Sequence, residues 1–215
     1  MRKCYHVLAV ALVAMMAVPA FAADIKSPNL HDAPFNSGRV AFTCDDDVLS
    51  SAYFANALSA YGNAFDVGAG GPLSHVEFWH YGWFTLAGPY DYNLKVYDEA
   101  TCTEIASIPL VAAHAFDHDE LAVEDLCTYG IAVSGAIVVA VEPLSCAAPT
   151  DCYPDVYFDD VAPVNDCTRI VDTTGPSGCD VGGFLNDHVL RISVDECGGT
   201  PTDEASWGGV KNLYR

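Results

Sequence analysis

Residues that could do chemistry are present in this sequence, but their spacing matches no catalytic motif. His114 and His118 lie four residues apart, as the zinc-binding histidines of a helix do. No glutamate follows His114, and Ala-Phe-Asp between the two does not favour a helix, so we interpret them as loop histidines. Carboxylate pairs such as Asp159 and Asp160, or aspartates 45–47, could serve glycoside hydrolysis, but a chain with 29 acidic residues contains such pairs by chance. A Gly-x-Ser-x-Gly motif is also absent, and the sequence therefore predicts a non-enzymatic protein.

Aspartates gather in the cysteine-bounded stretch 151–166, and calcium is the one cofactor that they suggest. Closely placed carboxylates and loop carbonyls can supply the oxygen shell that calcium needs, and the ion would relieve the repulsion among the carboxylates. The pattern matches no EF-hand, and the alternative is a solvated acidic loop. The candidate ligands are Asp151, Asp155, Asp159, Asp160 and Asp166.

Aromatic residues cluster between positions 79 and 92. If they lie on an exposed face they could stack on sugar rings or anchor a protein partner; if they lie inward they belong to a sandwich core. The binding hypothesis therefore predicts exposed rings, and the structural hypothesis predicts buried ones. The candidate ligand-binding residues are Trp79, Tyr81, Trp83, Phe84 and Tyr90, with Tyr92 next to them.

The N-terminus is typical of an export signal. Arg2 and Lys3 precede an apolar run over 7–18, and Ala20-Phe21-Ala22 forms a small-x-small cleavage site, so we expect a signal peptide over 1–22. Cleavage would remove two of the nine basic residues and none of the 29 acidic ones, leaving a formal charge of -22. Such a charge makes nucleic acid an unlikely partner. No later apolar segment is long enough to span a membrane.

Cysteine usage agrees with an extracellular setting. An even number of cysteines follows the predicted signal peptide, which implies disulfides in an exported chain, and their spacing does not suit zinc. These cysteines are Cys44, Cys102, Cys127, Cys146, Cys152, Cys167, Cys179 and Cys197. Connectivity is not fixed by sequence, but neighbours that flank turns are the natural partners, so we expect Cys146 with Cys152 and Cys167 with Cys179. Cys102 with Cys127, and Cys44 with Cys197, would complete the set.

The elements that must position these residues are mostly strands. Residues 23–40 form an extended lead-in, and a helical spacing of apolar residues predicts a short helix over 48–61. After Gly70-Gly71-Pro72 the period changes to two, which predicts strands at 76–81, 92–97, 120–124, 136–141, 155–158 and 189–194. Many short strands with Gly, Pro and Asp between them favour one all-β domain over 41–197. We expect a two-layer antiparallel β-sandwich with jelly-roll topology, or a fibronectin-like one as the alternative.

Three stretches resemble a broad, poorly characterised class of secreted bacterial β-sandwich proteins: Leu73-Ser-His-Val-Glu-Phe-Trp79, Tyr92-Asn-Leu-Lys-Val-Tyr-Asp98 and Asp187-His-Val-Leu-Arg-Ile-Ser-Val194. The resemblance implies a core strand, a strand before a hairpin and a closing strand, in that order, and an extracellular setting. It implies no reaction.

The C-terminal segment 206–215 is similar to short tails, running from a tryptophan to an arginine, that end some secreted proteins of uncultured bacteria. It follows a linker over 198–205, and we expect it to be a sorting or docking tail that can be removed without unfolding the domain. The alternative is a C-terminal strand or cap packed on the body. The residues that would be recognised are Trp207, Lys211, Tyr214 and Arg215.

Together these features predict a secreted or cell-surface, non-catalytic β-sandwich module. Its role would be structural or ligand-binding, with a glycan or a surface protein as the partner. The alternative function is that of a calcium-dependent extracellular hydrolase or of its accessory domain, which would need a cleft with two converging carboxylates.

Overall fold

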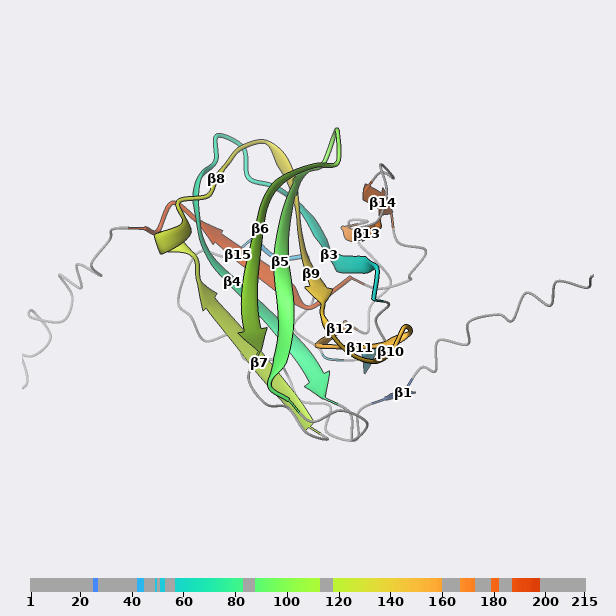
Figure 1. The fold of residues 1–215 in the computed structure, drawn as a ribbon. Coiled ribbons are helices and arrows are strands. Elements are labelled where there is room, and N and C mark those ends of the chain that lie inside the picture. The colour runs from blue at the N-terminus through green and yellow to red at the C-terminus, as the bar shows by residue number, and fades with distance from the viewer. Residues whose placement is uncertain are drawn as a thin grey trace, which may run out of the picture.

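The computed structural model describes residues 25–26, 42–44, 49, 51–52, 57–82, 88–112, 118–159, 167–172, 179–181 and 187–197. In these residues the chain forms two antiparallel sheets that face each other, a two-stranded hairpin, and one turn of 3-10 helix, η1 (Cys127–Tyr129) (Figure 1). The expected all-β, antiparallel and disulfide-stabilised architecture is confirmed. Among the described residues, no helix is long and apolar enough to cross a membrane.

The first sheet, here called the β3 sheet, has six antiparallel strands. Their spatial order is β14 (Cys179–Val181), β13 (Thr168–Asp172), β3 (Ser59–Asp66), β9 (Ala136–Pro143), β5 (Tyr90–Asp98) and β6 (Thr103–Ala112). Only β5–β6 and β13–β14 join strands that follow each other along the chain. The other pairs connect distant segments, so the sheet cannot form before most of the chain has been assembled.

The second sheet, here called the β4 sheet, is built around the long strand β4 (Gly71–Gly82). One edge of β4 pairs with β7 (His118–Asp125), and the other edge pairs first with β15 (Leu190–Val194) and then with β12 (Asp155–Phe158). Short strands complete the sheet: β8 (Ala132–Val133) pairs with the start of β4, β2 (Ser51–Ala52) with β12, and β1 (Ile25–Lys26) with β2. The remaining pair, β10 (Ser145–Ala148) and β11 (Asp151–Tyr153), forms a separate hairpin.

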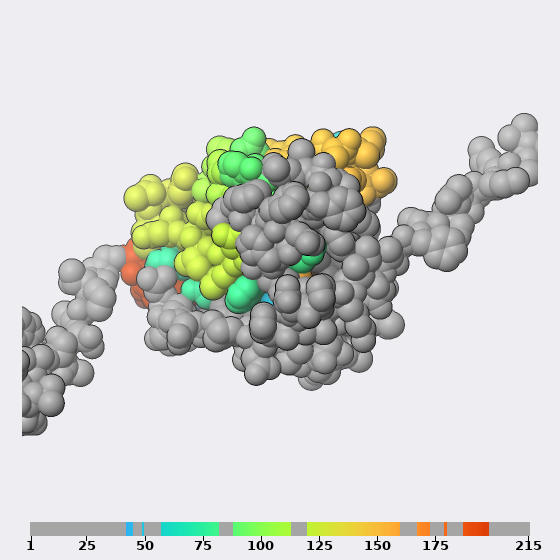
Figure 2. Space-filling view, turned by 90° about the horizontal axis from the view of Figure 1, so that it is seen from below, coloured from blue at the N-terminus to red at the C-terminus, as the bar shows by residue number. Residues whose placement is uncertain are grey.

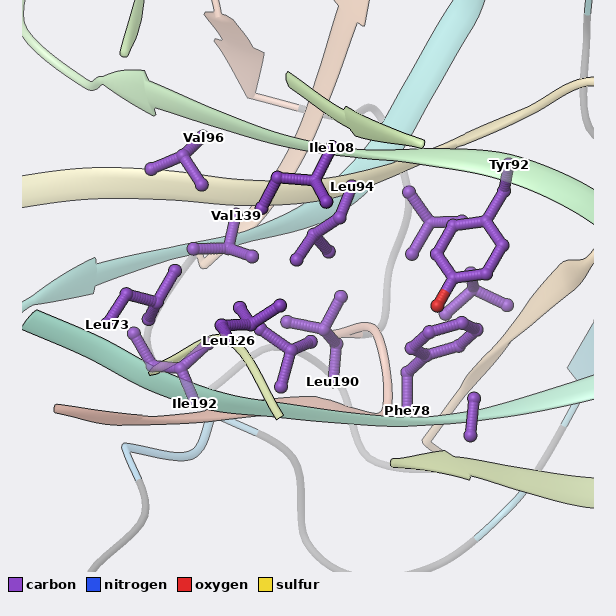
Figure 3. Packing of buried hydrophobic residues seen from close by; sticks show 14 of the residues in the cluster. Leu73, Phe78, Tyr92, Leu94, Val96, Ile108, Leu126, Val139, Leu190 and Ile192 are labelled. Atoms are coloured by element: carbon purple, nitrogen blue, oxygen red, sulfur yellow. The ribbon is translucent and has the colours of Figure 1, made fainter. Parts of the chain in front are cut away.

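The core lies between the two sheets, where alternate residues of β4 and β5 meet (Figure 3). Phe78 on β4 meets Tyr92 on β5 edge to face, with ring centroids 5.4 Å apart, and both side chains are fully buried. Residues of the opposite parity, such as Trp79 and Tyr97, pack in separate small clusters on the outer faces. The predicted two-residue alternation along both strands is therefore confirmed. Burial of each large apolar side chain contributes about 1.5–3 kcal/mol to folding.

The predicted helix over 48–61 is wrong. Where that range is described it forms β2 and the beginning of β3, with a turn at Ala57 and Leu58. In β3 the larger side chains point inward at every second residue, and the outer positions are occupied by Ala60, Gly62 and Ala64. Small residues on one face hide the alternation from a hydrophobicity pattern, and their packing against β9 and β13 decides in favour of a strand.

All eight cysteines after the predicted signal peptide form disulfides: Cys44–Cys167, Cys102–Cys179, Cys127–Cys197 and Cys146–Cys152. The predicted Cys146–Cys152 pair, which joins opposite residues of the β10–β11 hairpin, is confirmed. The pairs Cys167–Cys179, Cys102–Cys127 and Cys44–Cys197 are wrong. Cysteines that are close in the sequence lie far apart where a strand separates them, so they pair with cysteines that are distant in the sequence. Cys167 reaches Cys44 because β13 pairs with β3: the Ala64 N–H donates to the Cys167 carbonyl at 2.8 Å, and Cys44 Sγ lies 3.6 Å from the Ala64 carbonyl oxygen.

Candidate functional site

Asn63 connects the two sheets from the middle of β3. Its Nδ2 donates to the carbonyl oxygens of His188 at 2.7 Å and Leu190 at 3.4 Å, and its Oδ1 accepts from the His188 N–H at 3.2 Å. Asn63 is fully buried, and His188 and Leu190 belong to the opposite sheet and the residues just before it. The amide thus adds hydrogen bonds to backbone groups of the facing sheet, including the His188 carbonyl, which also accepts from the Leu190 N–H at 2.8 Å.

Two buried aspartates extend this connection. Asp187 Oδ1 accepts from the Cys167 N–H at 3.2 Å and from Thr168 Oγ1 at 3.1 Å, and the Asp187 N–H donates to Asp159 Oδ1 at 3.1 Å. The Asp159 N–H returns a bond to the Asp187 carbonyl at 3.0 Å. Asn63, Asp159, Thr168, Asp187 and His188 are together called the inter-sheet network below. Every member is less than a tenth exposed, so the network joins the sheets and offers no surface to solvent.

His188 is the histidine of the inter-sheet network, and its ring is packed between aromatic rings. Its ring lies 4.2 Å from that of Phe158 and 6.3 Å from that of Tyr61, between centroids. Burial lowers the pKa of His188 to about 3, against an opposing hydrogen bond with the Gly62 backbone. The imidazole is therefore neutral near pH 7 and acts as a packed ring, not as a cation for binding an anion.

A second polar group, the end cluster, lies at the C-terminal part of β4. It comprises His80, Tyr90, Glu120, Tyr153 and Asp155. His80 is opposite Glu120 in the β4–β7 ladder, and the Tyr90 ring stacks on Tyr153 at 5.1 Å and meets His80 edge to face at 6.4 Å. Burial, together with the charges of Asp155 and Glu120, raises the pKa of Tyr90 to about 12, so the phenol stays protonated near pH 7.

A related contact lies further along β7. Tyr92 Oη donates to Glu124 Oε1 at 2.7 Å. Burial of the ring and this hydrogen bond both raise the pKa of Tyr92 above the usual range of tyrosine. The neutral Tyr92 phenol therefore donates a hydrogen bond from β5 to β7, across the two sheets.

Histidine, tyrosine and carboxylate groups can move protons in an active site, but a substrate must reach them. His80, Tyr90 and Asp155 are completely buried, and so is Asn63 of the inter-sheet network. What this arrangement can do chemically is satisfy polar groups inside the sandwich and fix the relative position of the sheets.

The structure divides the aromatic residues that were expected to bind a ligand. Tyr81 and Tyr90 are buried, as is Tyr92, so for these rings the prediction of an exposed patch is wrong. Tyr81 packs with Leu49 and Tyr157, because odd positions of β4 face a small apolar cluster on the outer side of the sheet. Trp79 is half-buried beside this cluster. The predicted site residues Trp83 and Phe84 lie outside the described residues.

The aspartates that were expected to bind calcium are likewise only partly described. Asp155 and Asp159 are buried, and Asp159 accepts the Asp187 N–H. Asp151 accepts a hydrogen bond from Tyr153 Oη at 2.6 Å. Asp160 and Asp166 lie outside the described residues, and within the described part of the chain no group of three or more His, Cys, Asp or Glu side chains is placed to hold a metal ion. Calcium binding stays a prediction.

Other sequence-predicted residues also fall outside the described ranges. His118 begins β7, but its predicted partner His114 is not described. The same holds for aspartates 45–47, the signal peptide over 1–22, and the tail with Trp207, Lys211, Tyr214 and Arg215. The zinc-spacing, carboxylate-pair, signal-peptide and tail interpretations therefore stay predictions.

Sequence reasoning missed the polar residues that hold the sheets together. Asn63 occupies an inward position between Tyr61 and Phe65, and His80 follows Phe78 on the inward face of β4. A polar residue at an inward position of an alternating strand was the available signal, because such a residue must find a hydrogen-bond partner once it is buried. His188 had no comparable signal, since it precedes β15 and is buried only by long-range packing.

Comparisons with protein-family models, with curated proteins and with solved structures found no match to this chain.

Proposed function

We propose that this protein is an exported, non-catalytic β-sandwich with a structural role outside the cell, acting as a rigid module that holds its loops and its C-terminal segment in place. The observation that carries the proposal is the inter-sheet network. Polar side chains that would perform chemistry in an open site, above all Asn63, Asp187 and His188, are buried and bonded between the sheets. Their arrangement favours persistence of one conformation over binding or turnover.

The disulfides support this proposal. Cys44–Cys167, Cys102–Cys179 and Cys127–Cys197 each connect segments that are at least 70 residues apart. Long closed loops restrict the unfolded chain most, and such bonds persist in oxidising compartments. A secreted or surface-exposed module has no chaperone nearby, so the stability that such disulfides provide matters most there.

A ligand-binding role is the second candidate, and Trp79 is the observation that favours it. Of the candidate aromatic side chains that the structure describes, Trp79 alone is not buried. On the outer face of the β4 sheet it lies opposite Leu121, and Val123 on the same strand is half exposed. A partly exposed indole beside apolar side chains can stack on a sugar ring or anchor a protein side chain.

One binding experiment tests the structural proposal against this candidate. The purified mature protein is screened on a glycan array and on whole cells, in parallel with its Trp79→Ala variant. A structural module should give no saturable binding to either. Saturable binding that Trp79→Ala abolishes would overturn the structural proposal in favour of the second candidate. Val111→Ala, which removes an exposed apolar side chain of the opposite sheet, is the matched control and should leave any such binding unchanged.

A further inference from the structure

Strand β7 has one edge for which the described residues provide no partner. It pairs along its whole length with β4, and it forms no second strand pairing within the described part of the chain. Figure 1 shows β7 at the side of the sandwich, at the margin of the β4 sheet. An open strand edge presents a row of backbone N–H and C=O groups to which an extended segment can bind.

The inner face of β7 is acidic. Glu120, Ala122 and Glu124 are opposite inward residues of β4, and Tyr92 of the facing sheet donates to Glu124 at 2.7 Å. The outer face carries Leu121, Val123 and Asp125 instead, and Val123 is half exposed. A strand that adds to this edge would therefore best present cations on one face and polar or apolar side chains on the other.

The cations of the described body lie elsewhere. Lys95 pairs with Glu104 at 2.9 Å and with Glu142 at 3.5 Å, and Arg169 pairs with Glu99, all on or beside the β3 sheet. Arg191 lies on β15, across β4 from β7, and Lys26 lies on β1, beyond β12 on the same side of β4 as β15. Neither β7 nor β6 contains a lysine or an arginine, so the acidic edge favours a basic partner strand.

The chain's own C-terminus has the matching pattern. In an extended segment Lys211, Leu213 and Arg215 share one face, and Val210, Asn212 and Tyr214 share the other. The two cations are four residues apart, as Glu120 and Glu124 are. Antiparallel pairing with Lys211 opposite Glu124 also places Leu213 opposite Ala122 and Arg215 opposite Glu120.

The chain is also anchored where this pairing requires. Cys197 is bonded to Cys127 in η1, which begins two residues after β7 ends at Asp125. Twelve residues, 198–209, then separate Cys197 from Val210. They include Gly198-Gly199-Thr200-Pro201 and Gly208-Gly209, which suit a turn. Twelve residues are more than enough to reverse the chain and bring 210–215 back along β7 in the antiparallel sense.

We propose that residues 210–215 bind in cis to the open edge of β7 as an added antiparallel strand, with Lys211 and Arg215 beside Glu124 and Glu120. The docked segment shields the edge of the sandwich from other strands. It is held by few backbone bonds and by ion pairs at the rim, so a competing partner or high salt can release it. In this way residues 210–215 would stay bound to their own domain until another protein binds them.

Hydrogen exchange of the backbone amides in the mature full-length protein tests the proposal. The comparison variant is V210K/K211V/Y214R/R215Y, which keeps composition and net charge but moves both cations to the other face of the segment. At low ionic strength, the edge amides of residues 120–125 should exchange at least about tenfold faster in this variant than in the wild type, because an open edge is not protected. K211R/R215K, which keeps the charge pattern, should exchange like the wild type. Equal rates in the wild type and in the exchanged-face variant would overturn the proposal.

Dilution separates docking in cis from exchange of tails between molecules. Protection within one chain does not depend on protein concentration, so exchange rates should be the same over about a hundredfold dilution. Protection that falls on dilution together with loss of a dimer in sedimentation would overturn the proposal, because the occupant of the edge would then be a second copy. Raising the salt concentration should speed exchange at residues 120–125 in the wild type and leave the exchanged-face variant nearly unchanged.

Discussion

Asn63 links two sheets with three hydrogen bonds from one short side chain. Strands within a sheet satisfy each other's backbone groups, but facing sheets normally touch only through apolar side chains. The carbonyls of His188 and Leu190 would lose the Asn63 amide if any apolar residue replaced it. A single polar residue thus fixes how the beginning of β15 lies against β3.

Asn63→Ala should therefore lower the free energy of unfolding by about 2–4 kcal/mol, because it leaves buried backbone groups unsatisfied and creates a small cavity. Chemical denaturation monitored by tryptophan fluorescence measures this. The matched control is Asn93→Ala. Asn93 Nδ2 donates to Glu142 at 2.6 Å but is only partly buried, so its loss should cost less than about 1 kcal/mol. Equal losses in the two variants would show that Asn63 has no special role between the sheets.

His188 should make the domain sensitive to acid. Its pKa is near 6.5 in the unfolded chain and is lowered to about 3 in the folded one, so below pH 6.5 only the unfolded state takes up this proton. The stability that neutral His188 provides is present above pH 6.5 and is lost progressively as the pH falls towards 3, by up to about 1.4 kcal/mol per pH unit.

The measurement is the denaturation midpoint of the wild type and of His188→Phe between pH 7 and pH 4. Phenylalanine keeps a ring against Phe158 but does not titrate, so the variant should lose less stability over this range than the wild type. Carboxylates titrate in both proteins, and their contribution cancels in the comparison. Parallel pH profiles would contradict the role of His188.

At the scale of elements, the β10–β11 hairpin carries a disulfide of a different kind from the other three. Cys146 and Cys152 are only six residues apart and directly opposite in the hairpin, whereas Cys44 and Cys167 are 123 residues apart. Restriction of the unfolded chain by the shorter loop is worth about 2 kcal/mol, against about 5 kcal/mol for the longer one. Cys146 is also exposed.

The double variant Cys146→Ala/Cys152→Ala should consequently keep the fold and lose clearly less stability than Cys44→Ala/Cys167→Ala. Thermal unfolding followed by circular dichroism measures both. Under limiting reductant the hairpin bond should also be the first to open, since a thiolate can reach Cys146 most easily. Mass mapping of alkylated cysteines identifies the bond, and prior opening of Cys44–Cys167 would contradict this order.

The stretch 151–166, which begins in β11 of the hairpin, is where calcium binding was predicted. If Asp151, Asp155, Asp159, Asp160 and Asp166 form a site, saturating calcium should raise the melting temperature and a chelator should lower it, since a ligand that binds only the folded state stabilises it. Magnesium should have much less effect, because it demands a stricter octahedral shell. A melting temperature indifferent to calcium at physiological ionic strength would contradict calcium binding by these aspartates.

At the scale of the whole molecule, four disulfides join segments of the body that the two facing sheets form. Figure 2 shows one face of this body, on which described residues from the middle of the chain, coloured green to orange, lie side by side. Within the described residues, Lys95 and Arg169 form ion pairs with glutamates, and Arg191 is buried. The full sequence has a formal net charge of -20 at pH 7. A net negative charge of this size repels other acidic surfaces.

Alkylation without reduction should label no cysteine in the mature protein produced under oxidising conditions, because all eight are paired. Intact mass after treatment with iodoacetamide measures this directly. A reduced and alkylated sample serves as the control and should gain eight adducts. Two or more adducts per molecule without reduction would contradict the four-disulfide framework.

The sequence by itself determined the kind of protein: strands where apolar residues alternate at 76–81 and 92–97, an all-β class, and the pairing of Cys146 with Cys152. These features depend on local spacing, which a sequence displays directly. The strand over 59–66 was not visible in this way, because alanine and glycine on its outer face give no alternating signal.

Tertiary structure alone decided the three long-range disulfides, the burial of Tyr81 and Tyr90 in packed clusters, and the bonds of Asn63 to His188. Each of these joins residues that come together only when non-consecutive strands pair, as β3 does with β9 and β13, and β4 with β15. Strand order is set by the combined packing of both sheets and not by any local segment. A sequence pattern shows that a residue faces inward, but which residue it meets there depends on the whole fold.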